Sequence, residues 1–414
     1  MVIRRITCMP GLLNMIVPIL YILLLSYRIF YIPVSLFLKK KERDCSFSYH
    51  DYGILICARN EEDVIADLLD SIQRQTYPKD HFETFVMADN CADRTALIAK
   101  EKGVNVYERH DLERIGKGYA LEKLLKDIER DHGERFDAYI VVDADNIMKE
   151  DFIEQMNLNY CKGECIIAGY IASKNYDSNW ISAGYSLFLL HKNRFLNNAR
   201  HILGSGCAIN GTGFLFDRKL IGEWNYHTLT EDIELSVDQA SRGHRIGYCE
   251  KAIVYDEQPT SFRQSFLQRS RWAKGYLQVM KKYSIFLMKG IAEGDFTCWD
   301  MWNTVCSGYF LPLLSVAACL FRFLYLIGKG GNLSVFLWTL GSSLLRTYLC
   351  VFLTGILTVV CERKNIHASV FLAFLYTLTY PLFLATYLPI AVYALFAKVS
   401  WAPIRHTLSL SQTE

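Results

Sequence analysis

Long charge-poor stretches at both ends of the chain constrain its fold more than any other feature. Gly11–Leu38 carries a single charge, Arg28, and Asn303–Ile327, Asn332–Val360 and Ser369–Ala397 are each long enough to cross a bilayer. A signal peptide is the alternative for the first stretch, but its apolar part is too long and no small-residue cleavage site follows it. Buried core helices are the alternative for the other three, but three such charge-poor stretches in succession favour membrane spans. We therefore expect an integral membrane protein.

The flanking charges predict which side of the membrane each part occupies. Lys39-Lys40-Lys41-Glu42-Arg43 follows the first span, and a basic cluster beside a span marks the cytoplasmic side. The 13 cysteines show no metal-type spacing, as is usual for buried thiols in a reducing compartment. We expect a protein of the plasma membrane whose charged middle part is cytoplasmic.

Three features inside the C-terminal spans are unusual. Pro381 and Pro389 interrupt the last stretch, which predicts a broken or re-entrant helix. Arg322 and Arg346 are costly inside a bilayer and are expected to face a polar cavity, although Arg322 is close enough to the end of its span to snorkel. Arg346 lies nearer the middle of its span and is the better candidate for a polar pathway.

The middle of the chain alternates apolar runs with helical patterns. Such alternation predicts an α/β domain with a mostly parallel sheet and helices on both faces. The expected strands are Gly53–Ala58, Phe82–Ala88, Val104–Tyr107 and Ala138–Val142. We divide the chain into an N-terminal span and its basic flank (1–44), a cytosolic catalytic domain (45–258), amphipathic interfacial helices (259–300) and a C-terminal transmembrane region (301–414).

Carboxylates follow two of these strands, at the sheet edge where ligands of parallel sheets bind. Asp143 and Asp145 come directly after the fourth strand, where two carboxylates can share a hard divalent cation that bridges phosphate oxygens. Loop aspartates that cap the next helix are the alternative. Asp89 ends the second strand and can accept hydrogen bonds from a base ring, with a helix cap or Asx turn as the alternative.

Small residues mark two loops. Lys117 lies between two glycines ahead of a helix and can reach a phosphate, although it lacks the full phosphate-loop pattern and is otherwise a solvated lysine. Gly211, Thr212 and Gly213 let the backbone approach a ligand closely, with an ordinary turn as the alternative.

Two further motifs lie downstream of these loops. In Thr230-Glu231-Asp232, the threonine is a candidate helix cap, and an aspartate beside a bound sugar can act as general base toward a hydroxyl. In Gln268-x-x-Arg271-Trp272, the first two side chains share a helix face. Arg271 can hold a phosphate and Trp272 offers a flat apolar surface to a sugar or to the lipid interface.

In this order and spacing, these motifs resemble those of the family 2 glycosyltransferases with a GT-A fold, in particular the cellulose, chitin, hyaluronan and poly-N-acetylglucosamine synthases. The resemblance runs from about Gly53 to Tyr283. It implies that the following residues bind nucleotide or substrate: Ala58, Asn60, Glu61, Asp89, Lys117, Asp143, Gly211, Thr212, Gly213, Gln268, Arg271 and Trp272. It also implies that Asp143 and Asp145 hold Mg2+ or Mn2+, and that Asp232, with Glu231 beside it, supplies the catalytic base.

The resemblance implies an inverting transfer from a UDP-sugar, with UDP-GlcNAc, UDP-Glc or UDP-GlcA as the expected donors. Our first hypothesis is extension of a β-linked polysaccharide, exported through the protein's own spans. The alternative is transfer of one sugar to a lipid, as in ceramide glucosyltransferases. A non-enzymatic scaffold is disfavoured because every catalytic carboxylate is present. Carbohydrate or lipid acceptor and membrane lipid are the expected partners. The net charge of +2 gives no reason to expect nucleic acid, and the sequence does not predict an oligomeric state.

Overall fold

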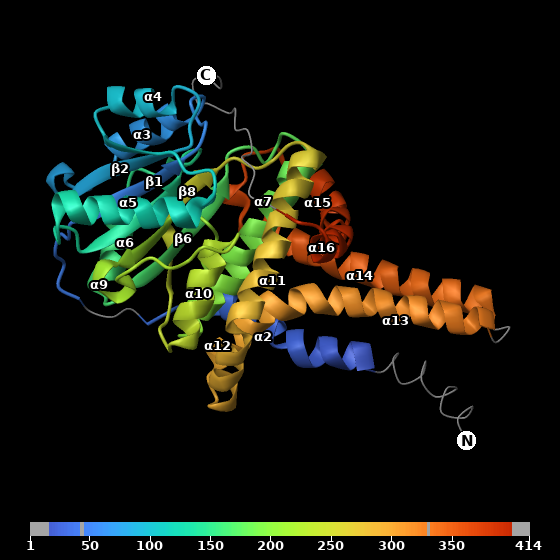
Figure 1. Ribbon diagram of the computed structural model, residues 1–414. Helices are drawn as coiled ribbons and strands as arrows, with labels where there is room; N and C mark the ends of the chain where they lie inside the picture. Colours follow the sequence, from blue (N-terminus) through green and yellow to red (C-terminus); the bar gives the residue numbers. More distant parts are fainter. Residues whose placement is uncertain (1–15, 42–44, 329–331, 400–414) are drawn as a thin grey trace.

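The computed structural model describes residues 16–41, 45–328 and 332–399. Glu42 and Arg43 of the basic cluster lie outside the described residues. A globular body carries the sheet, and long helices project from one side of it (Figure 1). The predicted domain boundaries stay predictions.

An eight-stranded sheet in the order β3-β2-β1-β4-β7-β6-β8-β5 organises the body. The first four strands in space, β3 (Asn105–Arg109), β2 (Phe82–Asp89), β1 (Tyr52–Ala58) and β4 (Ala138–Asp143), are parallel. All four were predicted within two residues at each end. Their carboxyl ends therefore meet at one edge, with Cys57 of β1 in register with Asp143 of β4.

Strict alternation of buried side chains explains why helices cover both faces of the sheet. Leu55 packs on one face with Leu121 and Leu124 of α5 (Lys117–His132). Its neighbours Ile54 and Ile56 pack on the other face, with α3 (Ile65–Gln73), α4 (Thr95–Glu101) and α6 (Phe152–Cys161). Successive strand residues point to opposite faces, so a continuous apolar run must be covered twice. The predicted mostly parallel α/β fold is confirmed.

The other half of the sheet mixes strand directions. β7 (Phe214–Asp217) is antiparallel to both β4 and β6 (Ile166–Ser173), and β8 (Gly247–Asp256) runs parallel to β6. The short β5 (Ile147–Met148) pairs antiparallel with β8. This arrangement brings the loop before β7 next to the end of β4.

Four helices are long and apolar enough to cross a membrane: Ile16–Phe37, Phe310–Gly328, Leu333–Cys361 and Val370–Phe396. They overlap the four predicted spans. The first includes α2 (Tyr27–Phe37), and the next two form α13 (Gly308–Gly328) and α14 (Leu333–Cys361), which project together from the body (Figure 1). Few of their side chains are buried, because bilayer lipid is the expected neighbour of such helices.

The last apolar stretch is broken, as its prolines predicted. α15 (Val370–Ala385) ends at Thr386 and α16 (Tyr387–Phe396) follows. α15 packs against α7 (Trp180–His191) of the body, so closely that a Cβ on Gly184 would lie 2.4 Å from the Phe383 ring. Lys274 of α11 (Phe262–Ala292) donates to the carbonyl of Ala394, so the end of α16 packs back against α11.

Buried polar contacts join the spans to the body, and two sets of them hold α2 and the end of α14. Arg200 of α8 (Asn198–Leu203) donates to both oxygens of Asp300 on α12 (Phe296–Trp302), at 2.7 and 2.9 Å. Tyr27 and Tyr31 of α2 donate to the same carboxylate. These contacts hold the N-terminal span against α8 and α12 of the body.

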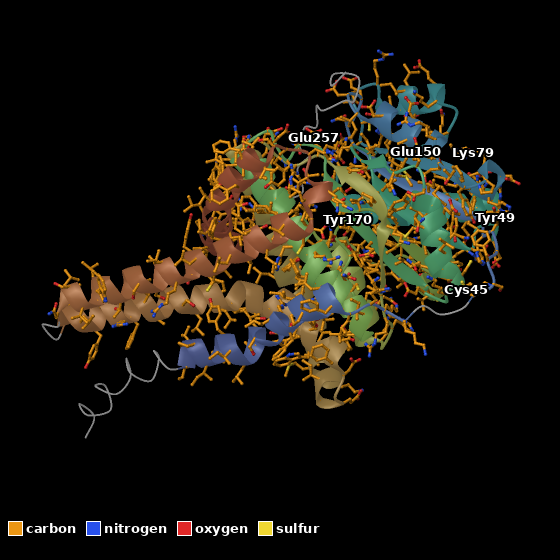
Figure 2. All side chains as sticks on the ribbon, turned by 180° about the vertical axis from the view of Figure 1, so that it is seen from behind. Cys45, Tyr49, Lys79, Glu150, Tyr170 and Glu257 are labelled. Atoms are coloured by element: carbon orange, nitrogen blue, oxygen red, sulfur yellow. The ribbon has the colours of Figure 1, made fainter. Side chains whose placement is uncertain are left out.

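Tyr170 of β6, labelled in Figure 2, belongs to the second set. Its hydroxyl donates to Glu362 just after α14, and Asn365 donates to both of these residues. The end of α14 is thereby held on the sheet, and α13 and α14 are anchored at the body while their far ends are free of it.

Candidate functional site

A cavity of about 2310 Å3 joins the sheet edge to the spans. Its lining comes from the carboxyl ends of β1, β2 and β4, from α10 (Glu231–Ser241) and α11 (Phe262–Ala292), and from the spans α13, α14, α15 and α16. A ligand in this space can therefore touch the catalytic domain at one end and the membrane part at the other.

The turns after β1 and β2 each contain an asparagine in the left-handed backbone conformation. Asn60 and Asn90 have φ angles of 58° and 54°, a conformation that asparagine tolerates better than most residues. Asn60 accepts a hydrogen bond from the backbone N–H of Ala92, and Asn90 bonds both Asp89 and Asp111. Asn60 thus holds the neighbouring loop and does not line the cavity, whereas Ala58 and Glu61 do.

Asp89 is buried at the end of β2 and is paired with Arg109 at the end of β3, at 2.6 Å. Burial raises the pKa of Asp89, and the Arg109 guanidinium opposes that rise. Arg109 also bonds Asp111, which fixes the loop that follows β3. The sequence analysis missed Arg109, although a basic residue at the end of the neighbouring strand is a detectable signal.

Lys117 begins α5 and reaches across the sheet edge to the carboxylate of Asp143, with a second bond to the carbonyl of Gly211 at 2.8 Å. Burial disfavours its charge, but Asp143 and Glu231 outweigh that effect and raise the pKa of Lys117. The lysine therefore stays charged beside the carboxylates, where it can meet a diphosphate.

The Gly211–Gly213 loop is locked onto the end of β4. Thr212 accepts a hydrogen bond from the backbone N–H of Asp143 at 2.9 Å and donates to the buried Asn146. Gly213 donates to Val141 and has a φ of 62°, and a Cβ there would lie 2.7 Å from Val254. The glycine is required for close packing and does not itself line the cavity.

Asp143 and Asp145 supply hard oxygen donors on one wall of the cavity. Within the described ranges, no group of three or more histidine, cysteine or acidic side chains could hold a metal ion by itself. The two carboxylates nevertheless suit Mg2+ or Mn2+, which commonly bind through one or two carboxylates and complete their shell with phosphate oxygens and water.

Glu231 and Asp232 open α10 on the opposite wall. Burial and the charge of Asp232 raise the pKa of Glu231, while Lys117 and Arg271 oppose the rise. Burial also raises the pKa of Asp232, and Lys192 is among the charges that oppose it. Glu231 thus interacts electrostatically with Lys117 and Arg271, and Asp232 interacts with these two cations and with Lys192.

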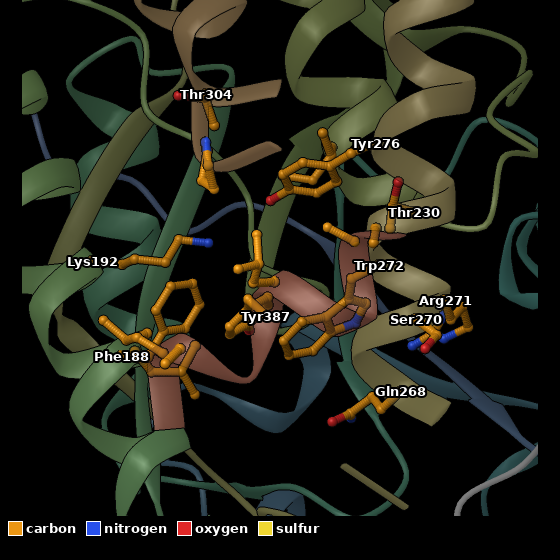
Figure 3. Close-up of a pocket in the computed structure, with 18 of the residues that line it drawn as sticks. Phe188, Lys192, Thr230, Gln268, Ser270, Arg271, Trp272, Tyr276, Thr304 and Tyr387 are labelled. Carbon is orange, nitrogen blue, oxygen red and sulfur yellow. The ribbon is translucent and has the colours of Figure 1, made fainter. Parts of the chain in front are cut away.

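α11 forms the third wall. Gln268, Arg271 and Trp272 all line the cavity and are labelled in Figure 3. Arg271 donates to the carbonyl of Leu229 at 3.2 Å, just before the Glu231–Asp232 pair, and the Trp272 ring packs edge-on against Tyr185. The helix comes close enough that a Cβ on Gly275 would lie 2.4 Å from Thr230.

Arg269, between the residues of this motif, is fully buried and was not singled out from the sequence. It lies over the rings of Phe383 and Tyr387 and donates to Thr386 at 2.7 Å. These contacts hold α11 against the junction of α15 and α16. They thereby help to orient Gln268, Arg271 and Trp272 toward the cavity.

Several buried polar atoms of the cavity wall have no hydrogen-bond partner among the described residues. Buried polar groups are costly when unpaired, so these atoms indicate where a polar ligand is received. They belong to Asn210, Thr230, Gln268, Ser270 and Tyr387.

Of the residues predicted to form the site, all but two line this one cavity. The exceptions, Asn60 and Gly213, support its loops. The roles assigned to individual residues stay predictions, but the strand ends, the two acidic motifs and the α11 motif do converge.

A family model described as "Glycosyltransferase like family 2" matches residues 50–275. The chain is 26% identical to the probable glycosyltransferase YdaM of Bacillus subtilis, over 87% of this chain and 86% of that protein.

Two other relatives differ in the acceptor that their names imply. The chain is 27% identical to the beta-monoglucosyldiacylglycerol synthase of Trichormus variabilis, over 64% of this chain and 57% of that protein. It is 29% identical to a poly-beta-1,6-N-acetyl-D-glucosamine synthase of Staphylococcus aureus, over 57% of each chain. The matched region thus spans less than two thirds of either relative.

Among solved structures, the mannosyltransferase PcManGT from Pyrobaculum calidifontis, in complex with GDP-Man and Mn2+, matches with a TM-score of 0.61. The match covers 93% of this chain and 99% of that one at 16% identity, a level that shows a shared fold. It agrees with the predicted GT-A-type domain joined to membrane helices.

Proposed function

Because the chain belongs to glycosyltransferase-like family 2 and is a glycosyltransferase, we propose that it transfers one sugar from a UDP-sugar to a lipid acceptor, with inversion at the anomeric carbon. The single cavity carries this proposal: it holds the carboxylates and Lys117 at one end and is walled by bilayer-facing helices at the other. A lipid can enter such a space sideways between helices.

We assign the UDP-sugar donor to the edge of the sheet where β1, β2 and β4 end. Asp89 and Glu61 are suited to the uridine, and Lys117 and Arg271 to the diphosphate. Asp143 and Asp145 would hold Mg2+ or Mn2+, which would neutralise charge on the departing diphosphate. The solved mannosyltransferase of similar fold was crystallised with Mn2+ and a nucleotide sugar, in keeping with this assignment.

The acceptor hydroxyl belongs beside Asp232. Its proton passes to the Asp232 carboxylate while its oxygen forms a bond to the anomeric carbon. The bond between that carbon and the phosphate oxygen breaks, and the electron pair leaves with UDP. Attack from the face opposite the diphosphate inverts the anomeric centre. A carboxylate whose pKa is raised by its surroundings, as that of Asp232 is, is a better base than one in water.

The placement of the spans favours a lipid acceptor over a growing polysaccharide. α13 and α14 project from the body with few buried side chains, so among the described residues they do not enclose a closed channel (Figure 1). The beta-monoglucosyldiacylglycerol synthase is a relative whose name implies a lipid acceptor. Extension of a β-linked polysaccharide is the second candidate, supported by the poly-N-acetylglucosamine synthase relative and by the size of the cavity.

Purified protein in lipid nanodiscs, given radiolabelled UDP-Glc, UDP-GlcNAc, UDP-GlcA or GDP-Man with Mn2+, tests the proposal. We expect one UDP-sugar to label material that partitions into organic solvent and migrates as a single-sugar lipid. Label in a large, water-soluble product would favour the polysaccharide. GDP-Man as the preferred donor would contradict the nucleotide assignment, and no transfer from any donor would contradict the proposal as a whole.

A further inference from the structure

Charge is distributed unevenly along the cavity. The acidic residues that line it all belong to the catalytic domain and the segment leading into α11, whereas the described lining residues of the spans include arginines and no carboxylate. The span arginines are Arg28, Arg322 and Arg346. The membrane end of the cavity is therefore positively charged.

Lys192, at the start of the π-helical turn η2 (Lys192–Asn197), lies where these two ends meet. Its side chain points into the cavity in Figure 3. It forms no ion pair or hydrogen bond with any described residue, and its amine lies 5.3 Å from the centre of the Phe188 ring. Burial is the main cause that lowers the pKa of Lys192, Asp232 opposes it, and Arg200 and Arg28 add to it, so that the pKa is about 8.

Arg28 adds a second cation that is not fully neutralised. Asp300 is bound at short range by both nitrogens of Arg200, whereas the nearest nitrogen of Arg28 is 3.9 Å from it. Two guanidinium groups thus share one carboxylate, which leaves a net positive charge beside Thr304. Lys192 and Arg28 are both half-buried, and partly buried cations that are incompletely neutralised favour a bound anion, so this region is suited to one.

We infer that the acceptor is an anionic lipid, with a phosphate held by Lys192 and Arg28 and a free hydroxyl a few bonds away that is presented to Asp232. The inference rests on the proposed function, because it names the class of acceptor for the same site. The donor diphosphate is assigned elsewhere, to Lys117 and Arg271 at the sheet edge. A neutral diacylglycerol would satisfy Asp232 but would leave the Lys192 amine without an anion in contact with it.

Lipid binding measured by native mass spectrometry tests the inference without requiring catalysis. The full chain is titrated in detergent with phosphatidylglycerol, which has a phosphate and free hydroxyls, or with diacylglycerol, which has only a hydroxyl. We expect wild-type protein to bind phosphatidylglycerol about tenfold more tightly, and Lys192→Gln to lose most of that preference, because a charge-assisted hydrogen bond is removed. Lys192→Arg should retain it.

Lys289→Gln, which removes the same charge from the exposed part of α11, is the matched control for general attraction to anionic lipid and should keep the preference. Equal binding of the two lipids by wild-type protein, or an unchanged preference in Lys192→Gln, would overturn the inference. Soluble glycerol 3-phosphate binding as tightly as phosphatidylglycerol would overturn the lipid part of it. Phosphatidylglycerol binding that depends on Lys192, with no sugar transfer from any donor, would leave the anion site standing and remove the proposed function.

Discussion

At the residue scale, Asp232 stands between the donor end and the membrane end of the cavity, and the proposed chemistry depends on it. Asp232→Asn keeps the shape of the side chain but cannot accept the proton, so we expect kcat to fall by roughly 100-fold or more while UDP binding is kept. Glu231→Gln, next to it, is the comparison. Transfer rates and UDP affinity measured on both variants check this. Full activity of Asp232→Asn would move the base to another residue.

The pH dependence of transfer follows from the same carboxylate. Burial raises the pKa of Asp232, so kcat/KM should fall as the pH drops through a value above the ordinary aspartate range near 4. The positive charge of Lys192 lowers that pKa, so Lys192→Gln should move the acidic limb to higher pH. Profiles of the two proteins, recorded with the same donor, provide the measurement. A shift to lower pH would contradict the predicted interaction.

Removal of divalent metal is the third test at this scale. Chelation should abolish transfer, and Mn2+ or Mg2+ should restore it. Asp145→Asn removes one of the two proposed donor oxygens, so half-maximal activity should require about tenfold more metal. Asp151→Asn, which lies outside the cavity, should behave like wild type. Undiminished transfer in excess chelator would argue against a metal at this site.

At the scale of elements, the Arg200–Asp300 pair holds the N-terminal span to the catalytic domain. Breaking a buried pair by removing one charge costs about 3–5 kcal/mol, so Asp300→Asn should lower the melting temperature substantially. Glu108→Gln, in the exposed pair with Lys100, should leave it nearly unchanged. Thermal unfolding in detergent compares them. Equal melting temperatures would show that the pair contributes little.

The same pair predicts acid sensitivity. Burial alone would raise the pKa of Asp300, but Arg200 outweighs it and holds that pKa at about 2. Because the folded value is depressed below the unfolded value near 4, the contribution to stability is complete above about pH 4. It is lost as the pH falls from there toward 2. Asp300→Asn should therefore show a weaker loss of stability across this interval than wild type.

The elements differ in how far their sequence predicted them. β1, β2, β3 and β4 are continuous apolar runs between helical patterns, and such runs are typical of buried parallel strands, so the meeting of their carboxyl ends could be predicted. The antiparallel insertion of β7 beside β4 could not, because strand order depends on contacts between distant segments. For the same reason, neither Asp300 as the partner of Arg200 nor the contact of Arg269 with Tyr387 was predictable from local pattern.

At the scale of the whole molecule, the account requires the space between the spans to lead to the catalytic carboxylates. Ser343 of α14 lines the cavity, whereas Leu353 on the same helix is exposed and does not. Ser343→Trp should fill part of the membrane end and raise the KM for the lipid acceptor, while slow hydrolysis of the donor by water is unaffected. Leu353→Trp is the matched control and should leave both unchanged. An equal effect of both substitutions would indicate general damage to α14.

The most direct test of the central claim is an experimental structure of the protein in a phospholipid nanodisc with UDP and Mn2+. The account predicts nucleotide density between Asp89 and the Asp143–Asp145 pair, and a lipid headgroup between Asp232 and Lys192, in one continuous cavity. Nucleotide bound away from those carboxylates, or protein side chains separating the headgroup from Asp232, would contradict it.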